Sequence, residues 1–365
     1  MNWFSEDNEI LLNPRWPSSD RELLRAAARD VLDEQSLRGH LVLSSSGTTA
    51  ESWRSVKLIF LSKKAVLTAA ESVVKRFAFN SRDVFARSLP DFHVSGLGTS
   101  ARAFIAGGRL ADEKDPGVTV LSMVPTQLHD AVTEKRRPPG SLRRVFIGGG
   151  ILAPELEREA RQRGWPLVVT YGMTETAAMI AVREEADASL GFEILPHLQA
   201  DVSADNHLRL RGGSLATGLA ALSESGEARW RPLLDETAWF RTEDLASLRN
   251  GRLLIAGRGR DFVKIGGESV NVNRLREIFS QVLRNHQLPS IGFHLWARPS
   301  ARLGHEIILV SEGSAAADLA EDYNRRVLPF ERIREMIAVT AIPRTELGKV
   351  REEELKKMTT RLTKE

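Results

Sequence analysis

Short apolar runs alternate with helix-like segments through the middle of this chain, and this alternation narrows its possible folds more than any other feature. The runs at 118–124, 143–150 and 166–169 have the length and composition of buried strands, and helices are predicted near 126–132 and 154–163. Strands separated by helices form parallel sheets, because a parallel neighbour is reached only by a long crossover. Ligands bind such sheets at the carboxyl ends of the strands. The pattern therefore predicts an α/β fold whose site lies in the loops after these strands.

The regions on either side predict further layers of the same large domain. Residues 1–38 are expected to be helical from a cap at Ser19 or Asp20, followed by a strand at 40–45 and a helix at 62–77. From Thr174 the chain is expected to continue the alternation. After about residue 195, shorter strands with Gly-containing turns predict an antiparallel or barrel-like subdomain.

A second, smaller domain is predicted at the C-terminal end. The run GRGRD at 257–261 combines two glycines with three charges, which suits a hinge. Beyond it we predict helices near 273–283 and 315–326 and strands at 291–296 and 306–310. We therefore expect a large N-terminal domain of layered α/β subdomains at 1–257 and a small mobile α+β domain at 258–365.

The amino-acid composition argues against several classes of function. With 42% hydrophobic and 27% charged residues the chain resembles an ordinary globular protein, and its formal charge of +3 implies no strong field for nucleic acid or membranes. It has no cysteine, which excludes disulfides, thiolate metal sites and cysteine nucleophiles. No apolar run is long enough to span a bilayer, and the acidic N-terminus is unlike a signal peptide, so we expect a cytoplasmic protein. Its partners are expected to be small molecules, and the sequence leaves monomer and homodimer open.

The run VTYGMTETAAM after the third strand carries the most chemistry. Tyr171 offers a flat aromatic face, Thr174 a hydroxyl, and Glu175 a hard oxygen ligand for a divalent cation. A planar base, a phosphate and its magnesium ion require these groups together. This run predicts a nucleotide site with Glu175 as the metal ligand.

Two loops predict close approach of a ligand to the backbone. The loop after strand 40–45 contains Ser46, Gly47, Thr48 and Thr49, whose N–H and O–H groups can donate to a polyphosphate, although the spacing is not that of a Walker loop. The strand at 143–150 ends in three glycines, of which Gly149 and Gly150 let a flat ligand approach or simply form a tight turn.

These motifs, in this order, resemble those of the adenylate-forming enzymes, the acyl-CoA synthetase and luciferase superfamily. The resemblance implies that Gly149 and Gly150 line an adenine pocket opposite Tyr171. It also implies that Asp244, in WFRTEDLA, holds both ribose hydroxyls, a task that suits a carboxylate accepting two hydrogen bonds. Glu243 stands where the family usually has glycine.

The phosphate loop departs from the family pattern Ser-Gly-Thr-Thr-Gly-x-Pro-Lys. Ala50 and Ser52 replace the later glycine and proline, and Trp53 or Arg54 takes the place of the lysine. Either Arg54 or Lys57 is a candidate to replace that lysine contact. The loop also begins early in the chain, so the sequence resembles a shortened member that lacks much of the first subdomain.

Two C-terminal runs are similar to the hinge and terminal motifs of the family. In GRGRDFVKIGGESVNVNRLREIF the resemblance gives Arg258 a contact with ribose or phosphate and places Gly266 and Gly267 against the pantetheine arm of CoA. In PRTELGKVREEEL it makes Lys349 the main catalytic candidate, because an ammonium group can bridge the acyl carboxylate and the α-phosphate as charge moves toward pyrophosphate. The alternative for Lys349 is a surface lysine on a charged helix.

The run LPDFHVSGLGTSARAFIAGG resembles the o-succinylbenzoate–CoA ligases of menaquinone biosynthesis. The resemblance suggests that His93, Ser95 and Arg102 line the acyl and pantetheine pocket, although His93 is equally explained as a packed core residue. Arginine suits a substrate with a second carboxylate, because its fork binds that group in two places.

The expected reaction is therefore the ATP- and Mg²⁺-dependent activation of o-succinylbenzoate as an acyl-adenylate, followed by transfer to CoA. The two steps are expected to use two poses of the C-terminal domain. Two alternatives remain at this point. One is an aryl- or fatty-acid–CoA ligase of the same superfamily, and the other is a catalytically degenerate nucleotide-binding protein, motivated by the altered phosphate loop.

Overall fold

The computed structural model describes residues 1–45, 56–150, 152–223, 226–258, 262–265, 268–300, 303–313, 317–345 and 350–362. Spatial contacts divide the chain into two compact units. Unit 1 comprises Met1–Thr242 and Ala246–Ile255, and unit 2 comprises Glu243–Leu245 and Ala256–Glu365. Each unit is described by itself.

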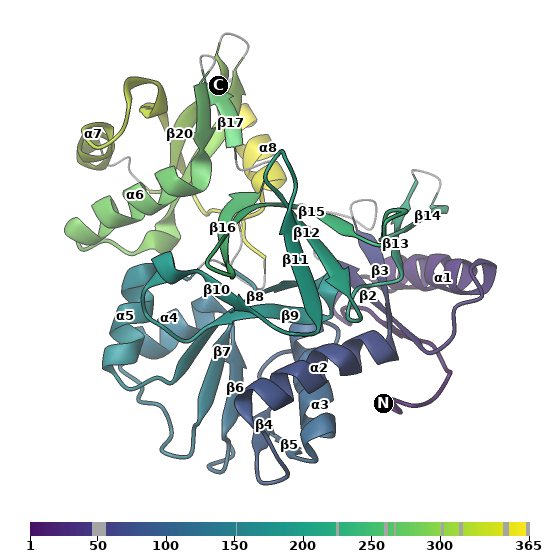
Figure 1. The fold of residues 1–365 in the computed structure, drawn as a ribbon. Coiled ribbons are helices and arrows are strands. Elements are labelled where there is room, and N and C mark those ends of the chain that lie inside the picture. The colour runs from purple at the N-terminus through teal and green to yellow at the C-terminus, as the bar shows by residue number, and fades with distance from the viewer. Residues whose placement is uncertain are drawn as a thin grey trace. The chain divides into compact units, whose positions relative to one another are not determined.

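The predicted α/β alternation is confirmed in unit 1. Strands β5, β4, β6, β7 and β8 lie side by side in that order and run parallel (Figure 1). Their bounds are β4 Val84–Ala86, β5 Arg109–Ala111, β6 Val120–Met123, β7 Arg144–Ile147 and β8 Leu167–Met173. The helices between them are α3 Val94–Ala106, α4 Pro125–Thr133 and α5 Pro154–Gln162, and α2 Lys63–Phe77 precedes β4.

Helices cover both faces of this parallel region because the strand side chains alternate. Phe146 and Val168 point to one face and share a core with α2 and α3. Val145, Ile147 and Leu167 point to the other face and pack against α4 and α5. Strands buried on both faces read as continuous apolar runs, which is why they stand out in the sequence.

The alternation ends at Met173, where the structure differs from the expectation. A short 3-10 turn at Thr174–Thr176 leads directly into strand β9 (Ala178–Arg183), which runs antiparallel to β8. The sheet then continues through β10 (Phe192–Ile194), β16 (Arg252–Arg258), β15 (Phe240–Arg249), β12 (His207–Gly212) and β11 (Leu198–Val202). The predicted antiparallel strands after residue 195 therefore extend the parallel sheet instead of forming a separate barrel.

A second sheet in unit 1 joins distant parts of the chain. Its order is β1 (Glu9–Leu11), β2 (His40–Ser45), β3 (Lys57–Ser62), β13 (Gly218–Leu222) and β14 (Ala228–Pro232). Helix α1 (Ser18–Glu34) packs on one face of this sheet. Leu41, Leu43 and Ile59 on the other face share a core with Ile180 and Leu253 of the large sheet.

Unit 2 is the α+β fold expected near the C-terminus. Helix α6 (Val272–Asn285), capped by the Asn271 side chain, and α7 (Ala317–Asn324) enclose one core with the sheet, and α8 (Glu352–Leu362) packs on a second core. The sheet comprises β17 (Phe262–Ile265), β18 (Glu268–Asn271), β19 (Phe293–Ser300), β20 (Gly304–Glu312) and β21 (Ile333–Val339). Strands β17, β18 and β21 were not predicted.

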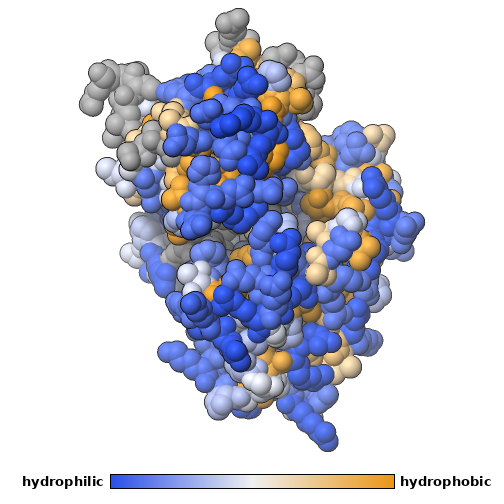
Figure 2. Space-filling view, turned by 90° about the vertical axis from the view of Figure 1, so that its left-hand side faces the viewer, coloured by the Kyte–Doolittle hydropathy of each residue, from blue (hydrophilic) through white to orange (hydrophobic). Residues whose placement is uncertain are grey.

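The surface has the mixture of hydrophobic and hydrophilic residues that the composition predicts. On the face seen in Figure 2, hydrophobic residues form small groups among hydrophilic ones. Within the described ranges, no helix has the length and apolar character needed to cross a membrane.

Candidate active site

The carboxyl ends of β6, β7 and β8 meet, as expected for parallel neighbours. A Cβ atom at Gly148 would lie 2.4 Å from the Thr170 Oγ1 atom, and that hydroxyl donates to the Ile147 carbonyl at 3.0 Å. Gly149 adopts a φ of +77°, which favours glycine. Its Cβ position and that of Gly150 lie 3.5 and 3.6 Å from Val124 and Pro125, just after β6. Thus Gly148 lies against β8, the strand that carries Tyr171, while Gly149 and Gly150 lie against the residues that follow β6.

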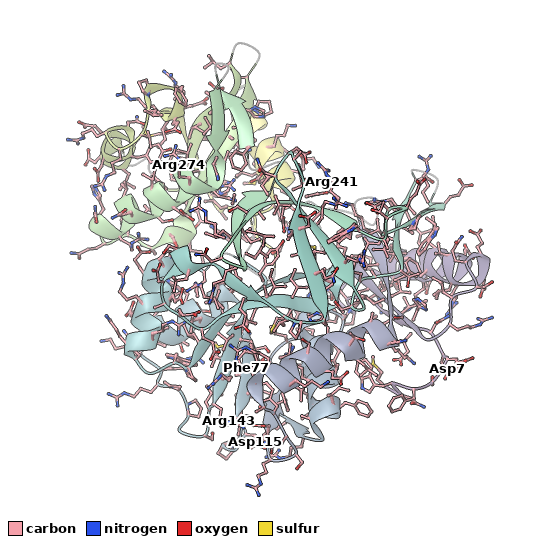
Figure 3. All side chains as sticks on the ribbon, viewed as in Figure 1. Asp7, Phe77, Asp115, Arg143, Arg241 and Arg274 are labelled. Carbon is pink, nitrogen blue, oxygen red and sulfur yellow. The ribbon has the colours of Figure 1, made fainter. Side chains whose placement is uncertain are left out.

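An ion pair and a hydrogen bond join the amino ends of the parallel strands. Asp83, which is 1% exposed, accepts from the Arg143 Nη1 atom at 2.6 Å and from the Thr119 hydroxyl at 2.8 Å. These residues precede β4, β7 and β6, and Arg143 is labelled near this end in Figure 3, close to the Asp115 label. Parallel sheets bind ligands at the other end, where the carboxyl ends of the strands lie.

Tyr171 is half-buried near the end of β8. Its ring packs against Phe192 of β10, with centroids 6.2 Å apart and planes at 46°. The next residue, Gly172, forms a bulge where the register between β8 and β9 shifts. A Cβ atom on Gly172 would lie 1.7 Å from the Ala178 carbonyl oxygen, so only glycine permits this turn.

Thr174 and Glu175 lie in the 3-10 turn after this bulge, and Thr176 holds the turn from inside. The buried Thr176 hydroxyl accepts from the Met173 N–H at 3.2 Å and lies 3.0 and 3.1 Å from the Met173 and Ala178 carbonyl oxygens. The Glu175 carbonyl accepts from the Ala216 N–H at 2.8 Å. The turn is therefore tied by its backbone to the segment that enters β13.

The second sheet brings the predicted phosphate loop to the same unit. Strands β2 and β3 form a hairpin whose last described pair is Ser45 and Lys57. The Thr217 N–H, next to Ala216, donates to the Phe60 carbonyl of β3 at 2.8 Å. The predicted residues Ser46, Gly47, Thr48 and Thr49, and the candidate Arg54, lie in the connection and outside the described residues.

The three predicted acyl-pocket residues lie in α3 or directly before it. His93 is the residue before the helix, half-buried, with its ring 4.6 Å from that of Phe92. Ser95 is half-buried in the first turn, and its carbonyl accepts from the Thr99 hydroxyl at 3.0 Å. Arg102 is 4% exposed and reaches toward the sheet, where its guanidinium lies 5.3 Å from the centre of the Phe146 ring.

Arg102 is an unusually placed cation. Its Nη2 atom donates to the hydroxyls of Thr99 at 2.8 Å and Ser122 at 3.2 Å. Within the described part of the chain it has no carboxylate partner, and its Nε atom is buried without a hydrogen bond. Burial lowers the pKa of Arg102 to about 10, so the group stays charged at neutral pH. Buried guanidinium groups are normally paired with an anion.

The remaining predicted residues fall near or in unit 2. Asp244 is buried on β15, on the same strand face as Thr242 and Ala246, while Glu243 is exposed on the other face. Arg258 ends β16, and Gly266, Gly267 and Lys349 lie outside the described residues. An antiparallel bridge joins Arg344 and Val350, described residues on either side of the segment that contains Lys349.

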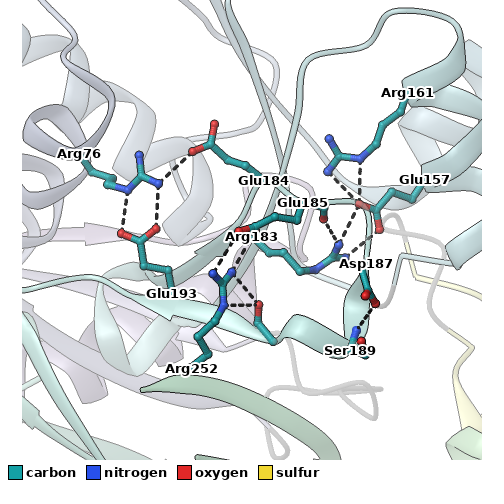
Figure 4. Close-up of polar contacts among 11 residues, drawn as sticks. Arg76, Glu157, Arg161, Arg183, Glu184, Glu185, Asp187, Ser189, Glu193 and Arg252 are labelled. Carbon is teal, nitrogen blue, oxygen red and sulfur yellow. Dashed lines mark hydrogen bonds and ion pairs between the residues drawn. The ribbon is translucent and has the colours of Figure 1, made fainter. Parts of the chain in front are cut away.

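Sequence reasoning missed Phe192, Thr170 and the polar residues behind them. Figure 4 shows an arginine–carboxylate network that surrounds β9 and β10 and includes Arg76, Glu157, Arg183, Glu193 and Arg252. No motif marks these residues, because their partners are distant in sequence and charged residues are common everywhere in the chain.

Comparison with known proteins identifies the family. Residues 40–213 match the model of the AMP-binding enzyme family. A 2-succinylbenzoate–CoA ligase from Salmonella typhimurium is 30% identical over 284 residues, which are 74% of this chain. The chain belongs to the adenylate-forming superfamily. An indoleacetate–CoA ligase from Aromatoleum aromaticum is also similar, at 26% identity over 88% of this chain and 68% of its own length.

Solved structures agree with this superfamily assignment. A structure of MenE from E. coli with bound OSB-AMS has a TM-score of 0.70 and 26% identity, and covers 87% of this chain and 68% of that one. A MenE structure from Bacillus subtilis with OSB-AMP has a TM-score of 0.71, and at 22% identity it shows the shared fold. The chain spans only 58% of the length of the Salmonella relative.

Proposed function

We propose that this chain is an AMP-forming acid–CoA ligase of the adenylate-forming superfamily and that its acid is o-succinylbenzoate. The curated relatives named 2-succinylbenzoate–CoA ligase and the MenE structure with bound OSB-AMS support the choice of acid. Menaquinone biosynthesis is the pathway that this assignment implies.

The buried Arg102 is the structural observation that supports a dicarboxylic acid as the substrate. A cation that is removed from water without an anionic partner is costly, and a bound carboxylate offsets that cost. The Nε atom is buried without a hydrogen bond within the described part of the chain, and it can donate to a carboxylate oxygen. In this proposal Arg102 binds the carboxylate that does not react.

The nucleotide is assigned to the ends of β7 and β8. The ring of Tyr171 would stack on adenine opposite Gly149 and Gly150, and Asp244 and Arg258 would bind the ribose and phosphate. Thr174 and the loop Ser46–Gly47–Thr48–Thr49 would bind the phosphates. The support is the close approach of Gly148, which precedes these two glycines, to Thr170 of β8, and the matching family model over 40–213.

Magnesium would be held through Glu175. The described residues contain no group of three His, Asp or Glu side chains suited to a metal ion. Mg²⁺ needs no such group, because it is usually held by one or two carboxylates together with the substrate phosphates. A single carboxylate in a turn beside the phosphate-binding residues fits this requirement, and the ion would neutralise phosphate charge.

The chemistry then proceeds in two steps. An oxygen of the reacting carboxylate attacks the α-phosphorus of ATP, the bond to pyrophosphate breaks, and an acyl-adenylate forms. Lys349 stabilises the charge that moves toward pyrophosphate. The thiolate of CoA then attacks the acyl carbon, the bond to AMP breaks, and Gly266 and Gly267 line the path of the pantetheine arm. We propose that unit 2 moves between the two steps.

Product identification tests the proposal. The purified chain is incubated with Mg-ATP, CoA and o-succinylbenzoate, and mass spectrometry should find the thioester together with AMP. Release of neither AMP nor thioester from any acid in a panel would favour the degenerate nucleotide-binding alternative.

Variants of Arg102 test the choice of acid. Arg102→Met should lower kcat/KM for o-succinylbenzoate about 10- to 100-fold, the range of a charge-assisted hydrogen-bonded contact, and leave acids with one carboxylate little changed. Arg109→Met, at an exposed arginine paired with Asp115, is the matched control. Equal losses for both kinds of acid would remove Arg102 from substrate recognition.

A second candidate activity is the ligation of an aryl acid with a single carboxylate. The similarity to indoleacetate–CoA ligase favours it, since that relative is matched over most of this chain. Indoleacetate in the same panel distinguishes the two, because a higher kcat/KM than for o-succinylbenzoate would select the aryl acid.

A further inference from the structure

Phe192, the residue that packs against Tyr171, lies on a strand held by three arginines from three different elements. Strand β10 has only three residues and pairs with β9 on one side and β16 on the other. A strand this short has few backbone hydrogen bonds of its own, so side-chain contacts fix its position.

The first of these contacts is a buried ion pair behind Phe192. Arg183, at the end of β9, donates two hydrogen bonds to the Glu157 carboxylate of α5, at 3.1 and 2.8 Å. The two side chains are 5% and 3% exposed. The Arg183 guanidinium lies 5.9 Å from the centre of the Phe192 ring. Arg161, one turn along α5, also donates to Glu157, at 3.0 and 2.8 Å (Figure 4).

The other two arginines hold the residues on either side of Phe192. Arg76 of α2 donates to both carboxylate oxygens of Glu193 at 2.8 Å. Arg252 of β16 donates to the Gly191 carbonyl at 3.3 and 3.1 Å and to the Glu185 carboxylate at 3.1 and 3.0 Å. Phe192 therefore has fixed neighbours along the strand and a charged, buried pair beneath its ring.

We infer that Glu157 and Arg183 are positioning residues for nucleotide binding, because they fix Phe192 and, through it, the ring of Tyr171. This inference rests on the proposed function, in which Tyr171 stacks on adenine. The pair touches neither nucleotide nor substrate. It orders the aromatic surface before the base arrives, so that less freedom is lost on binding.

AMP affinity measured by isothermal titration calorimetry tests this role. Glu157→Gln breaks the ion pair and Phe192→Leu removes the intervening ring, and each should raise the Kd for AMP about 3- to 10-fold, as expected for the loss of one aromatic contact. The Kd for tripolyphosphate, which has no base, should stay unchanged. Glu159→Gln is the matched control, because Glu159 forms an exposed pair with Arg163 on the same helix.

A double variant separates positioning from general loss of stability. If Glu157 acts through Phe192, combining Glu157→Gln with Phe192→Leu should weaken AMP binding no further than Phe192→Leu alone. Additive losses, or equal weakening of tripolyphosphate, would overturn the inference. Should Glu157→Gln fail to fold, an unchanged AMP affinity in Phe192→Leu would overturn it equally. If the unmodified chain bound no AMP, the proposed function itself would fail, whereas normal AMP binding by Glu157→Gln would refute only the positioning role.

Discussion

Several described residues of unit 1 bury a side-chain nitrogen or oxygen without a hydrogen bond, and burial also lowers the pKa of two of them. Arg102 is one, and its missing anion is the basis of the substrate proposal. His197, between β10 and β11, is the other. Both of its ring nitrogens are buried without a hydrogen bond among the described residues, and burial lowers its pKa to about 4. Nothing in the structure connects His197 to a ligand, so we expect it to affect stability.

We expect the free energy of unfolding to decrease as the pH decreases, because His197 has a lowered pKa in the folded chain. In the unfolded chain the ring has a pKa near 6.5 and binds a proton below that pH, whereas in the folded chain it stays neutral until about pH 4. The unfolded state therefore gains protons first, and stability is fully present above pH 6.5 and is lost as the pH falls toward 4. Between pH 7 and pH 5 the loss from this residue is about 2 kcal/mol.

Urea unfolding at pH 7 and pH 5 measures this effect. His197→Leu should have a smaller pH dependence of the free energy of unfolding than the unmodified chain, and His129→Leu, at an exposed site, should not. An identical pH dependence in all three proteins would exclude His197 as the cause.

For single residues, the sequence predicts those that lie within a local motif. It does not predict those whose role depends on contacts between distant parts of the chain. Tyr171, Glu175 and Arg102 were nominated from their runs. Phe192 could not be, because it meets Tyr171 only after β10 pairs with β9 and not with its nearest neighbours in sequence. The partners of Arg183 are hidden for the same reason.

Elements were predictable where both faces of a strand are buried. The apolar runs predict strands β6, β7 and β8, the apolar spacing predicts α2, and the alternation with strands predicts α4 and α5. Strand β9 was missed because a bulge at Gly172 turns the chain back beside β8, where the alternation favoured a helix. Strand β10, with three residues, gives too little pattern for detection.

A substitution at the Gly172 bulge tests the importance of the turn between β8 and β9. Gly172→Ala places a methyl group 1.7 Å from the Ala178 carbonyl, so β8 and β9 must shift and the turn with Thr174 and Glu175 must move with them. We expect a loss of about 1–3 kcal/mol in stability, as for other overpacked sites. The rate of ATP–pyrophosphate exchange should fall at least about tenfold.

Gly140→Ala is the control for that variant, because a Cβ atom there meets nothing within 4 Å. Full exchange activity in Gly172→Ala would show that the shape of this turn is unimportant for the first step.

For the whole molecule, the chain forms two compact units, and the proposed reaction has two steps that a variant of the terminal motif can separate. Lys349→Ala should lose most formation of acyl-adenylate, because no cation then bridges the two anions. The same variant should still convert supplied acyl-adenylate and CoA to thioester, since that step does not form pyrophosphate. The two rates are measured separately by pyrophosphate exchange and by thioester formation, and equal loss of both would contradict the role given to Lys349.

The small sheet of unit 1 has a consequence for biosynthesis. Strands β1 to β3 leave the ribosome early, but β13, which pairs with β3 along Gly218 to Ala221, follows only after all the parallel strands have been made. Until then the nascent chain carries an open β edge beside the apolar residues Ile59 and Phe60. Such an edge readily pairs with other chains. A pause in translation before Gly218 would therefore prolong the period in which this protein most needs a chaperone.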